Sequence, residues 1–476
     1  MSSPPVFDPW TTAWAYADVV ATTYAPAGVW RQRQAWRLDR LLRDIAPASA
    51  LYRERLAETD CTAAPLERLR QMRPVGKREL MQRFGEWVTD PEVTLAGLRA
   101  FLADRANRGE PYLGRCIAWE SSGTSGEPAV FVQDAQALAV ADAVEAARGP
   151  LAPAGVAALA GAWRVGTRIA LVSATDGHFA SVIAFERARL LNPWLRDVSR
   201  SFSFMQPIGA LVEQLNRFAP TVLATYPSTA WVLSEEQAAG RLRLSLQAVC
   251  TGGETLSPAV RRMVHERFRA PVRNSYGASE TFVIATECRS GRLHLNADWI
   301  VAEPVDEHFR PLPDGEVGAT TLLTNLANRL QPIIRYDIGD RVRFVPGTCD
   351  CGSSLPVIEV EGRNDDVLTL EAENGRVVHL SPLALVALLE EDVGVFDFQV
   401  LRRGTRALQL DLVRPPGPAG SGAARAVELL TRFLSAQGLA GIRIEVRERP
   451  GLPARGRSGK QRRILNTAAT PQPRRN

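Results

Sequence analysis

The lysine at position 460 is the residue of this chain whose type suggests chemistry most directly. Only two of the 57 basic residues are lysines, Lys77 and Lys460, and all the others are arginines. An arginine is a planar fork, whereas a lysine is a compact point charge on a flexible stem that fits between two anions. Lys460 ends a segment, residues 455–460, whose glycines allow a loop to approach a ligand closely. The alternative is an ordinary lysine on a solvated loop.

A run of small polar residues, 121–126, suggests phosphate binding. It reads Ser-Ser-Gly-Thr-Ser-Gly and follows Glu120. The backbone N–H groups and hydroxyls of such a loop can surround phosphate oxygens. No lysine follows its last glycine, as one would in a Walker A loop, and the spacing of a hydrolase nucleophile elbow is absent. The alternative is an ordinary Ser/Gly turn.

Three further segments have residue types that suit a nucleotide. Residues 251–254 (Thr-Gly-Gly-Glu) follow an expected strand, and glycines there allow a flat ligand to lie on the backbone. Residues 274–280 offer an amide, an aromatic ring, a hydroxyl and the carboxylate of Glu280, which can hold Mg²⁺. Asp340 ends the segment 335–340, where a carboxylate in a tight turn can accept both hydroxyls of a ribose. Turn and core roles are the alternatives.

A separate set of residues suits a metal ion. Its pattern is C-x5-H followed, after 54 residues, by C-x-C, and its members are Cys288, His294, Cys349 and Cys351. Four such ligands favour tetrahedral Zn²⁺, and because no ligand position is obviously open, the site would be structural. Four unrelated residues are the alternative, since cysteines are often buried. The remaining cysteines, Cys61, Cys116 and Cys250, are expected to be core thiols.

The elements expected around these segments alternate between strands and helices from about residue 115 to 345. This alternation predicts an α/β fold in which sheets are covered by helices. The expected strands are 168–173, 221–225, 247–250, 318–323 and 341–345, and the expected helices are 30–58, 212–218 and 258–268. In the helix 30–58, the apolar face would contain Trp36, Leu38, Leu41, Leu42 and Ile45.

A change in composition at residues 362–366 predicts a domain boundary. We therefore expect a large N-terminal domain (1–361), a hinge (362–366), a small mobile α+β domain (367–466) and a disordered tail (467–476). The small domain would contain strands at 367–370, 397–401, 408–412 and 442–446 and a helix at 423–436.

The overall composition is ordinary for a globular protein. A chain of 476 residues is too long for one compact core, so at least two domains are expected. A net charge of +5 is small for this length and makes a nucleic-acid partner a weak hypothesis. Neither a membrane-spanning run nor a signal peptide is recognisable, which predicts a cytoplasmic protein whose cysteines are thiols or metal ligands.

Taken in order, the segments 121–126, 251–254, 274–280 and 335–340 with Lys460 resemble the adenylate-forming superfamily of acyl-CoA synthetases, luciferases and adenylation domains. Residues 51–56 and 74–80 also resemble the leader of its phenylacetate–CoA ligase-like branch. The resemblance covers roughly residues 40–465. It implies a large domain bearing ATP and acid sites and a small domain that rotates about Asp365.

The resemblance also implies individual roles. Phosphates would be held by Ser121, Ser122, Gly123, Thr124, Ser125 and Gly126. Adenine would be surrounded by Gly252, Gly253, Glu254, Asn274 and Tyr276, and Gly277 would also belong to the cofactor-binding residues. Ser279 would touch the α-phosphate, Asp340 the ribose, and Arg363 the nucleotide. Glu280 would bind Mg²⁺, and Lys460, Glu280 and Thr124 would be the catalytic residues.

The acid-binding pocket is expected near Phe179, Tyr226, Pro227 and Ala278, whose sizes suggest an aromatic or medium-chain acid. His178 either lines this pocket or is a surface histidine. The implied function is an ATP-dependent acid–thiol ligase that passes an acyl group to CoA or to the phosphopantetheine arm of a carrier protein. The alternatives are a nucleotidyl transferase that places AMP on a hydroxyl and a nucleotide-binding protein without catalysis. A monomer and a homodimer are both compatible with the sequence.

Overall fold

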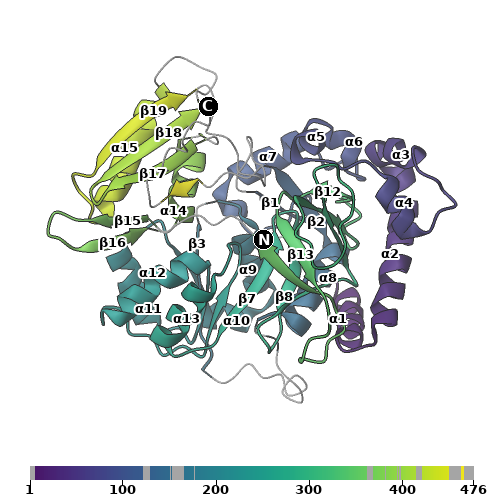
Figure 1. The fold of residues 1–476 in the computed structure, drawn as a ribbon, viewed down its shortest axis with the longest axis horizontal. Coiled ribbons are helices and arrows are strands. Elements are labelled where there is room, and N and C mark those ends of the chain that lie inside the picture. Colours follow the sequence, from purple (N-terminus) through teal and green to yellow (C-terminus); the bar gives the residue numbers. More distant parts are fainter. Residues whose placement is uncertain are drawn as a thin grey trace, which may run out of the picture.

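The chain folds into a large sheet-rich unit and a smaller C-terminal group of elements (Figure 1). This computed structural model describes residues 6–121, 129–150, 152, 166–175, 177–361, 368–380, 382–393, 395, 398–413, 421–449 and 463–465. The expected α/β class is therefore confirmed. The strands and helices predicted between residues 168 and 345 all overlap observed elements, and the predicted helix 258–268 coincides with α13 (Pro258–Phe268).

Helices precede the first strand. They are α1 (Pro9–Thr23), α2 (Ala27–Ala48), α3 (Ala50–Ala57), α4 (Pro65–Gln71), α5 (Lys77–Gln82), α6 (Phe84–Trp87), α7 (Leu95–Ala103) and a 3₁₀ turn, η1 (Arg105–Asn107). The single helix expected over 30–58 is two helices, because Ser49 caps α3 by accepting a hydrogen bond from the backbone N–H of Tyr52 at 3.4 Å. Trp36, expected on the apolar face of this helix, is half exposed, whereas Leu38, Leu41, Leu42 and Ile45 are buried.

The large unit contains a nine-stranded sheet with the spatial order β13-β14-β9-β8-β7-β6-β5-β3-β4. The strands from β4 to β7 are parallel, and those from β7 to β13 are antiparallel. Their bounds are β3 (Ile169–Ser173), β4 (Ser199–Ser203), β5 (Val222–Thr225), β6 (Ala248–Thr251), β7 (Val272–Ala278), β8 (Thr281–Glu287), β9 (Leu293–Leu295), β13 (Arg341–Val345) and β14 (Val357–Glu361). Ligands of α/β proteins bind at the carboxyl ends of such parallel strands.

Crossover helices accompany the parallel strands, because parallel neighbours cannot be joined by a tight turn. They are α9 (Ala180–Leu191), α10 (Pro193–Val198), α11 (Ile208–Phe218), α12 (Pro227–Ala238) and α13, and α8 (Ala135–Arg148) precedes them. Two smaller sheets complete the large unit. One pairs β1 (Cys116–Glu120) with β2 (Val130–Asp134), and the other contains β10 (Ile300–Val305), β11 (Thr320–Asn325) and β12 (Tyr336–Asp337).

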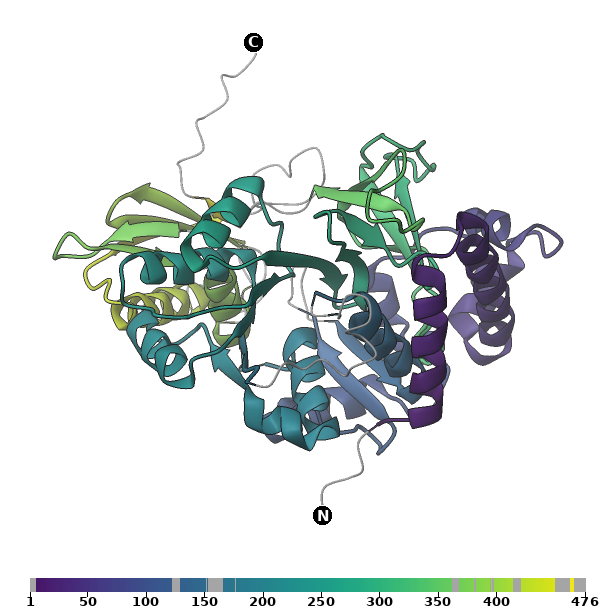
Figure 2. The same ribbon diagram turned by 90° about the horizontal axis from the view of Figure 1, so that it is seen from below.

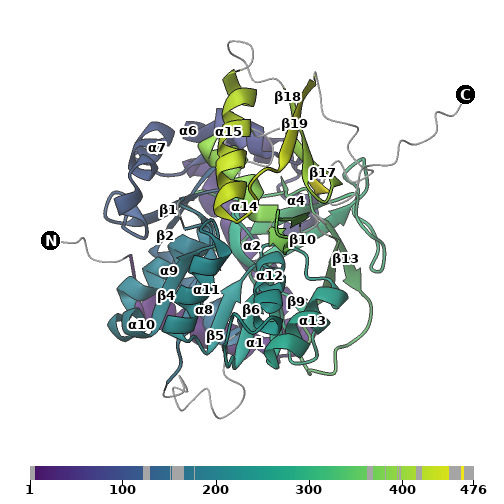
Figure 3. The same ribbon diagram turned by 90° about the vertical axis from the view of Figure 1, so that its left-hand side faces the viewer.

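The C-terminal elements have the α+β content that the sequence predicts. They are β15 (Leu368–Glu371), β16 (Val377–Leu380), α14 (Pro382–Ala387), the π-helical turn η3 (Leu388–Asp392), β17 (Phe398–Gly404), β18 (Ala407–Val413), α15 (Ser421–Ala436), β19 (Arg443–Arg449) and β20 (Ile464–Leu465). Figure 3 shows them beside α11 and α12. Gln437 joins the two parts, because its side chain accepts from the N–H of Ile208 at 3.0 Å and donates to the carbonyl of Gln206 at 2.9 Å.

Within the described residues, no helix combines the length and the apolar character that a membrane span requires. All six cysteines are free thiols, as expected. Cys116 and Cys250 are buried, but Cys61 is exposed, so its assignment to the core was wrong. Cys61 lies in the short connection between α3 and α4, where no neighbouring element covers it.

Candidate functional site

The hairpin between β7 and β8 forms the centre of the candidate nucleotide site. Ala278 pairs with Thr281, so Ser279 and Glu280 form its two-residue turn. The register shifts at Gly277, where an added Cβ would lie 2.1 Å from the carbonyl oxygen of Phe282. A contact of that length is not tolerated, so only glycine fits at position 277. This bulge places Glu280 at the tip of the hairpin, and Tyr276 lies on β7 before the turn.

Two tyrosine–carboxylate hydrogen bonds join this hairpin to the segment 336–340. The hydroxyl of Tyr276 donates to Oδ2 of Asp340 at 2.8 Å. The hydroxyl of Tyr336 donates to Oε1 of Glu280 at 2.8 Å. Burial raises the pKa of both tyrosines, and the charge of Glu280 adds to the effect, so both hydroxyls keep the proton that they donate. Two segments that the sequence singled out separately therefore meet.

Trp119 also contacts the turn formed by Ser279 and Glu280. Its indole N–H donates to the carbonyl of Ser279 at 2.8 Å, and its ring lies 4.4 Å from that of Phe282 between centroids. Sequence reasoning missed Trp119 and Tyr336 as residues of the site. Both lie in or beside segments that it did select, since Trp119 comes two residues before Ser121 and Tyr336 lies within 335–340.

The glycines after β6 are required by close packing. Gly253 has a φ of +78°, which favours glycine, and an added Cβ would lie 2.9 Å from the ring of Tyr226. An added Cβ at Gly252 would lie 2.9 Å from Oγ of Ser275. The backbone at 252–253 is therefore pressed between β7 and the start of α12, at the carboxyl edge of the parallel strands.

Glu254 and Asn274 have well-defined partners at this edge. The carboxylate of Glu254 accepts from the N–H of Ser228 at 2.8 Å and from its hydroxyl at 2.9 Å, which stabilises the first turn of α12. The amide oxygen of the buried Asn274 accepts from the hydroxyl of Thr251 at 3.0 Å. A side-chain orientation fixed in this way suits the recognition of a ligand edge.

Ser121 is the one residue of the expected phosphate loop that the structure describes. Its N–H donates to the carbonyl of Ala129 at 2.8 Å, and its hydroxyl accepts from the N–H of Ala129 at 3.0 Å. These bonds fix the two ends of the loop at β1 and β2. Several other predicted residues lie outside the described part of the chain, and their roles stay predictions: Ser122, Gly123, Thr124, Ser125, Gly126, Arg363, Asp365 and Lys460.

His178 lies in the segment between β3 and α9 and is buried, so the alternative of a surface histidine was wrong. Its Nε2 is 3.1 Å from the carbonyl oxygen of Asp104, and burial lowers its pKa, which favours the neutral ring. The backbone of Phe179 bridges that of Glu120 at the end of β1. The other expected pocket residues, Tyr226, Pro227 and Ala278, lie at the start of α12 and the end of β7.

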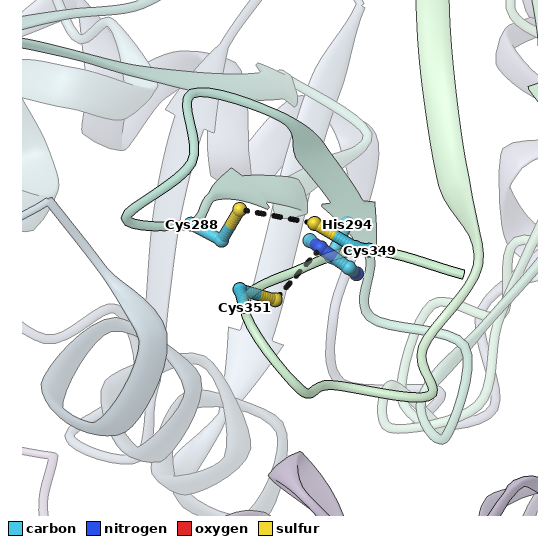
Figure 4. Close-up of side chains that lie close together, drawn as sticks. All are labelled: Cys288, His294, Cys349 and Cys351. Atoms are coloured by element: carbon cyan, nitrogen blue, oxygen red, sulfur yellow. Dashed lines mark hydrogen bonds between the residues drawn. The ribbon is translucent and has the colours of Figure 1, made fainter.

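The Cys/His residues converge at the opposite end of β8 (Figure 4). Their ligand atoms all lie within 4.8 Å of one another. Sγ of Cys288 is 3.7 Å from Sγ of Cys349, and Sγ of Cys351 is 3.4 Å from Nε2 of His294. Nδ1 of His294 lies 2.7 Å from the carbonyl oxygen of Leu355, which orients the imidazole so that Nε2 faces the three sulfur atoms.

Two adjacent hairpins bring these four residues together, as the sequence suggested. Cys288 follows β8 and His294 lies on β9, while Cys349 and Cys351 lie in the connection from β13 to β14. β14 pairs with β9 through Val357 and His294. Gly352, with a φ of +87°, turns the chain directly after the last cysteine. Residues 61 positions apart thus become neighbours through strand pairing.

Part of the chain is similar to known enzymes that bind AMP. Residues 122–322 match the family model of the AMP-binding enzymes. The chain is 31% identical over 197 residues to a phenylacetate-coenzyme A ligase of Thermus thermophilus, which covers 40% of this chain and 44% of the relative. It is 27% identical over 187 residues to Protein CapK of Staphylococcus aureus, which covers 38% of this chain and 40% of that protein. The chain thus spans less than half of the length of these curated relatives.

The fold extends over nearly the whole chain. A 2-hydroxyisobutyryl-CoA ligase, in complex with an acyl-adenylate and CoA in its thioesterification state, is 22% identical and covers 94% of this chain, and this chain covers 91% of it, with a TM-score of 0.57. An open conformation of that ligase gives a TM-score of 0.54 at 21% identity, with 93% of each chain covered. At this identity the likeness establishes the two-part architecture.

Proposed function

We propose that the chain belongs to the adenylate-forming superfamily, on its phenylacetate–CoA ligase-like branch, and that it is an ATP-dependent acid–thiol ligase. The observation that carries the proposal is the meeting of the β7–β8 hairpin with the segment 336–340. The hydrogen bond between Tyr276 and Asp340 joins residues 64 positions apart at the carboxyl edge of the parallel sheet. An aromatic ring, a carboxylate for ribose and a second carboxylate at the turn then face one ligand.

The proposed reaction has two steps. An oxygen of the acid attacks the α-phosphorus of ATP and forms a new O–P bond. The bond from the α-phosphorus to the oxygen that bridges it to the β-phosphorus breaks, and pyrophosphate leaves. A thiol, losing its proton, then attacks the acyl carbon, and AMP leaves. The first step converts a carboxylate, which is a poor acyl donor, into a mixed anhydride with a good leaving group. The thiol belongs to CoA or to the phosphopantetheine arm of a carrier protein.

The residues divide this work by their chemistry. Tyr276 offers a ring for stacking against adenine, and Asp340 accepts from the ribose hydroxyls. Glu280 is positioned by Tyr336 to hold Mg²⁺, which when bound supplies positive charge to phosphate oxygens. Lys460 is proposed to place its ammonium between the acid's carboxylate and the α-phosphate. The acid is proposed to be aromatic or of medium chain length, and the protein to work in the cytoplasm.

We also propose that the Cys/His cluster binds one structural Zn²⁺. With metal–sulfur and metal–nitrogen bonds of about 2.3 and 2.0 Å, the edges of a tetrahedral site are about 3.5–3.8 Å long. The separations of 3.7 Å between Cys288 and Cys349 and 3.4 Å between Cys351 and His294 fit these edges. All four donors come from the protein, which is the pattern of structural rather than catalytic zinc.

The activity is tested by measuring pyrophosphate release with ATP, Mg²⁺ and a panel of aryl and medium-chain acids, followed by CoA or a loaded carrier protein. We expect release that depends on one class of acid, and AMP formation when the thiol is added. Lys460→Ala should lower acid-dependent release on the order of 10²–10³-fold and spare thioester formation from supplied acyl-adenylate. Transfer of AMP to a hydroxyl compound without any thioester would instead identify a nucleotidyl transferase and overturn the proposal.

A further inference from the structure

The outward face of α1 is an uninterrupted apolar stripe. Figure 2 shows α1, in dark purple, on the near side of the ribbon. The exposed side chains recur at helical spacing, and they are Trp10, Ala13, Trp14, Ala17, Val20, Ala21 and Tyr24. Trp10 is 85% exposed, Trp14 58% and Tyr24 71%. Surface helices normally present polar residues on this face, and an apolar patch of this kind marks an interaction site.

The stripe carries no charge. The only charged residue between Pro9 and Tyr24 is Asp18, and it points inward, where its carboxylate forms ion pairs with Arg33 and Arg37 of α2. Interface cores are depleted in charge and enriched in tryptophan and tyrosine, which dominate binding energy. The composition of the stripe is therefore that of an interface core.

The helix is fixed with this face outward. On its inner side, the hydroxyl of Thr22 donates to Asp298 at 2.8 Å, and Arg148 donates to the hydroxyl of Thr23 at 3.0 Å. Ala15 and Val19 are buried on the same side. Because rotation of α1 would break these buried polar bonds, the tryptophans cannot turn inward. A rigid surface loses little conformational entropy when it is covered.

We infer that the stripe is covered by the same stripe of a second copy of this chain, in a two-fold symmetric dimer. Two-fold interfaces require a self-complementary patch. In an antiparallel pair of α1 helices that cross at Ala17, Trp10 faces Tyr24 of the second copy, and Ala13 faces Ala21. Small residues at the crossing allow close approach, and the aromatic residues fill the space at both ends.

The area is also adequate. Aromatic side chains bury about 150–250 Å² each, so the exposed parts of three of them, with the neighbouring small residues, offer roughly 500–600 Å². A stable interface buries about 800 Å² on each partner. The stripe on α1 would supply most of this area, and the residues around α1 would supply the rest. A lipid surface is disfavoured, because helices that lie on membranes carry Lys or Arg and α1 has neither. The inference is independent of the proposed ligase activity.

The test is the mass of the full-length protein in solution, measured by light scattering over a dilution series. We expect twice the mass of one chain. Ala17→Arg would place two like charges opposite each other at the crossing, and it should raise the dimer dissociation constant at least about tenfold. Ala35→Arg, on the exposed face of α2, is the matched control and should leave the dimer intact.

A second measurement covers the case in which Ala17→Arg disturbs folding. Ala17→Cys should form a disulfide-linked dimer under mild oxidation, and Ala35→Cys should not. A parent protein that is monomeric at every concentration overturns the inference. So does a dimer that persists in a folded Ala17→Arg variant, and so does a monomer that sediments with vesicles of neutral phospholipid.

Discussion

Strand β8 connects two polar clusters that differ in the kind of ligand atom that they offer. At its start, the carboxylates of Glu280 and Asp340 each accept a hydrogen bond from a tyrosine hydroxyl. Just after its end, four soft ligand atoms lie within 4.8 Å of one another, and the second nitrogen of His294 is already used by Leu355. The first cluster offers carboxylate oxygens, whereas the second offers sulfur atoms and an imidazole nitrogen.

The cluster at the start of β8 is therefore suited to catalysis, and the cluster after its end is suited to stabilising the fold. Tyrosine hydroxyls position the carboxylates of Glu280 and Asp340, which suits groups that are proposed to meet a nucleotide and its metal ion. The thiols and the imidazole of the second cluster lie close to one another, which suits an ion that holds two hairpins together. Changes at the start of β8 should therefore alter turnover at constant stability, and changes after its end should alter stability at constant turnover.

The largest expected effect is on turnover. Glu280→Gln removes a charge but keeps a carbonyl oxygen that can accept from Tyr336. We expect acid-dependent pyrophosphate release to fall on the order of 10²–10³-fold, because one electrostatic contact to the phosphates is lost. The melting temperature should not change. Glu58→Gln, at an exposed position, is the control, and equal activities of the two variants would contradict the assignment.

For the Cys/His cluster after the end of β8, we expect a loss of stability without a loss of turnover. Cys351→Ser should remove the bound zinc, measured by elemental analysis as about one ion per chain in the parent. At zinc concentrations about a thousandfold above the dissociation constant, the loss of binding lowers the free energy of unfolding by roughly 4 kcal/mol. The folded fraction should keep its kcat. Cys61→Ser, at an exposed thiol, should change neither property. A zinc-free parent with the same melting temperature would remove the metal from this cluster.

The smallest expected effects distinguish the role of Glu280 from that of Asp340. Tyr336→Phe removes the donor to Glu280, and Tyr276→Phe removes the donor to Asp340. A hydrogen bond to a charged group contributes about 1.5–3 kcal/mol, so each change should weaken one ligand about tenfold or more. Tyr336→Phe should raise the Mg²⁺ concentration for half-maximal activity, and Tyr276→Phe should raise the KM for ATP.

A measurement without turnover supports that comparison. Binding of Mn²⁺ to the protein with an unreactive ATP analogue should weaken in Tyr336→Phe and stay unchanged in Tyr276→Phe. If both variants alter metal and nucleotide affinity to the same extent, the tyrosines support the fold of the hairpin in general, and the assignment of one partner to each carboxylate fails.

Local patterns in the sequence determined most of the elements, the carboxylates of the first cluster and all four members of the second. Strands such as β13, the helix α13 and the C-terminal helix α15 follow from periodicity and flanking residues, which act over a few positions. The spacing of Cys288, His294, Cys349 and Cys351 selected the residues that meet after β8. The order of the motif segments, ending in Lys460, indicated a resemblance to AMP-binding enzymes, whose family model matches residues 122–322.

Only the tertiary structure decided which side chains meet and which faces are covered. Tyr336 contacts Glu280 across 56 positions, and no local pattern encodes that pairing. The exposure of Trp36, Cys61 and the stripe on α1 likewise depends on where neighbouring elements end. Periodicity shows that a helix has an apolar face, but burial depends on the presence of a second surface, and that surface comes from a distant part of the chain or from another molecule.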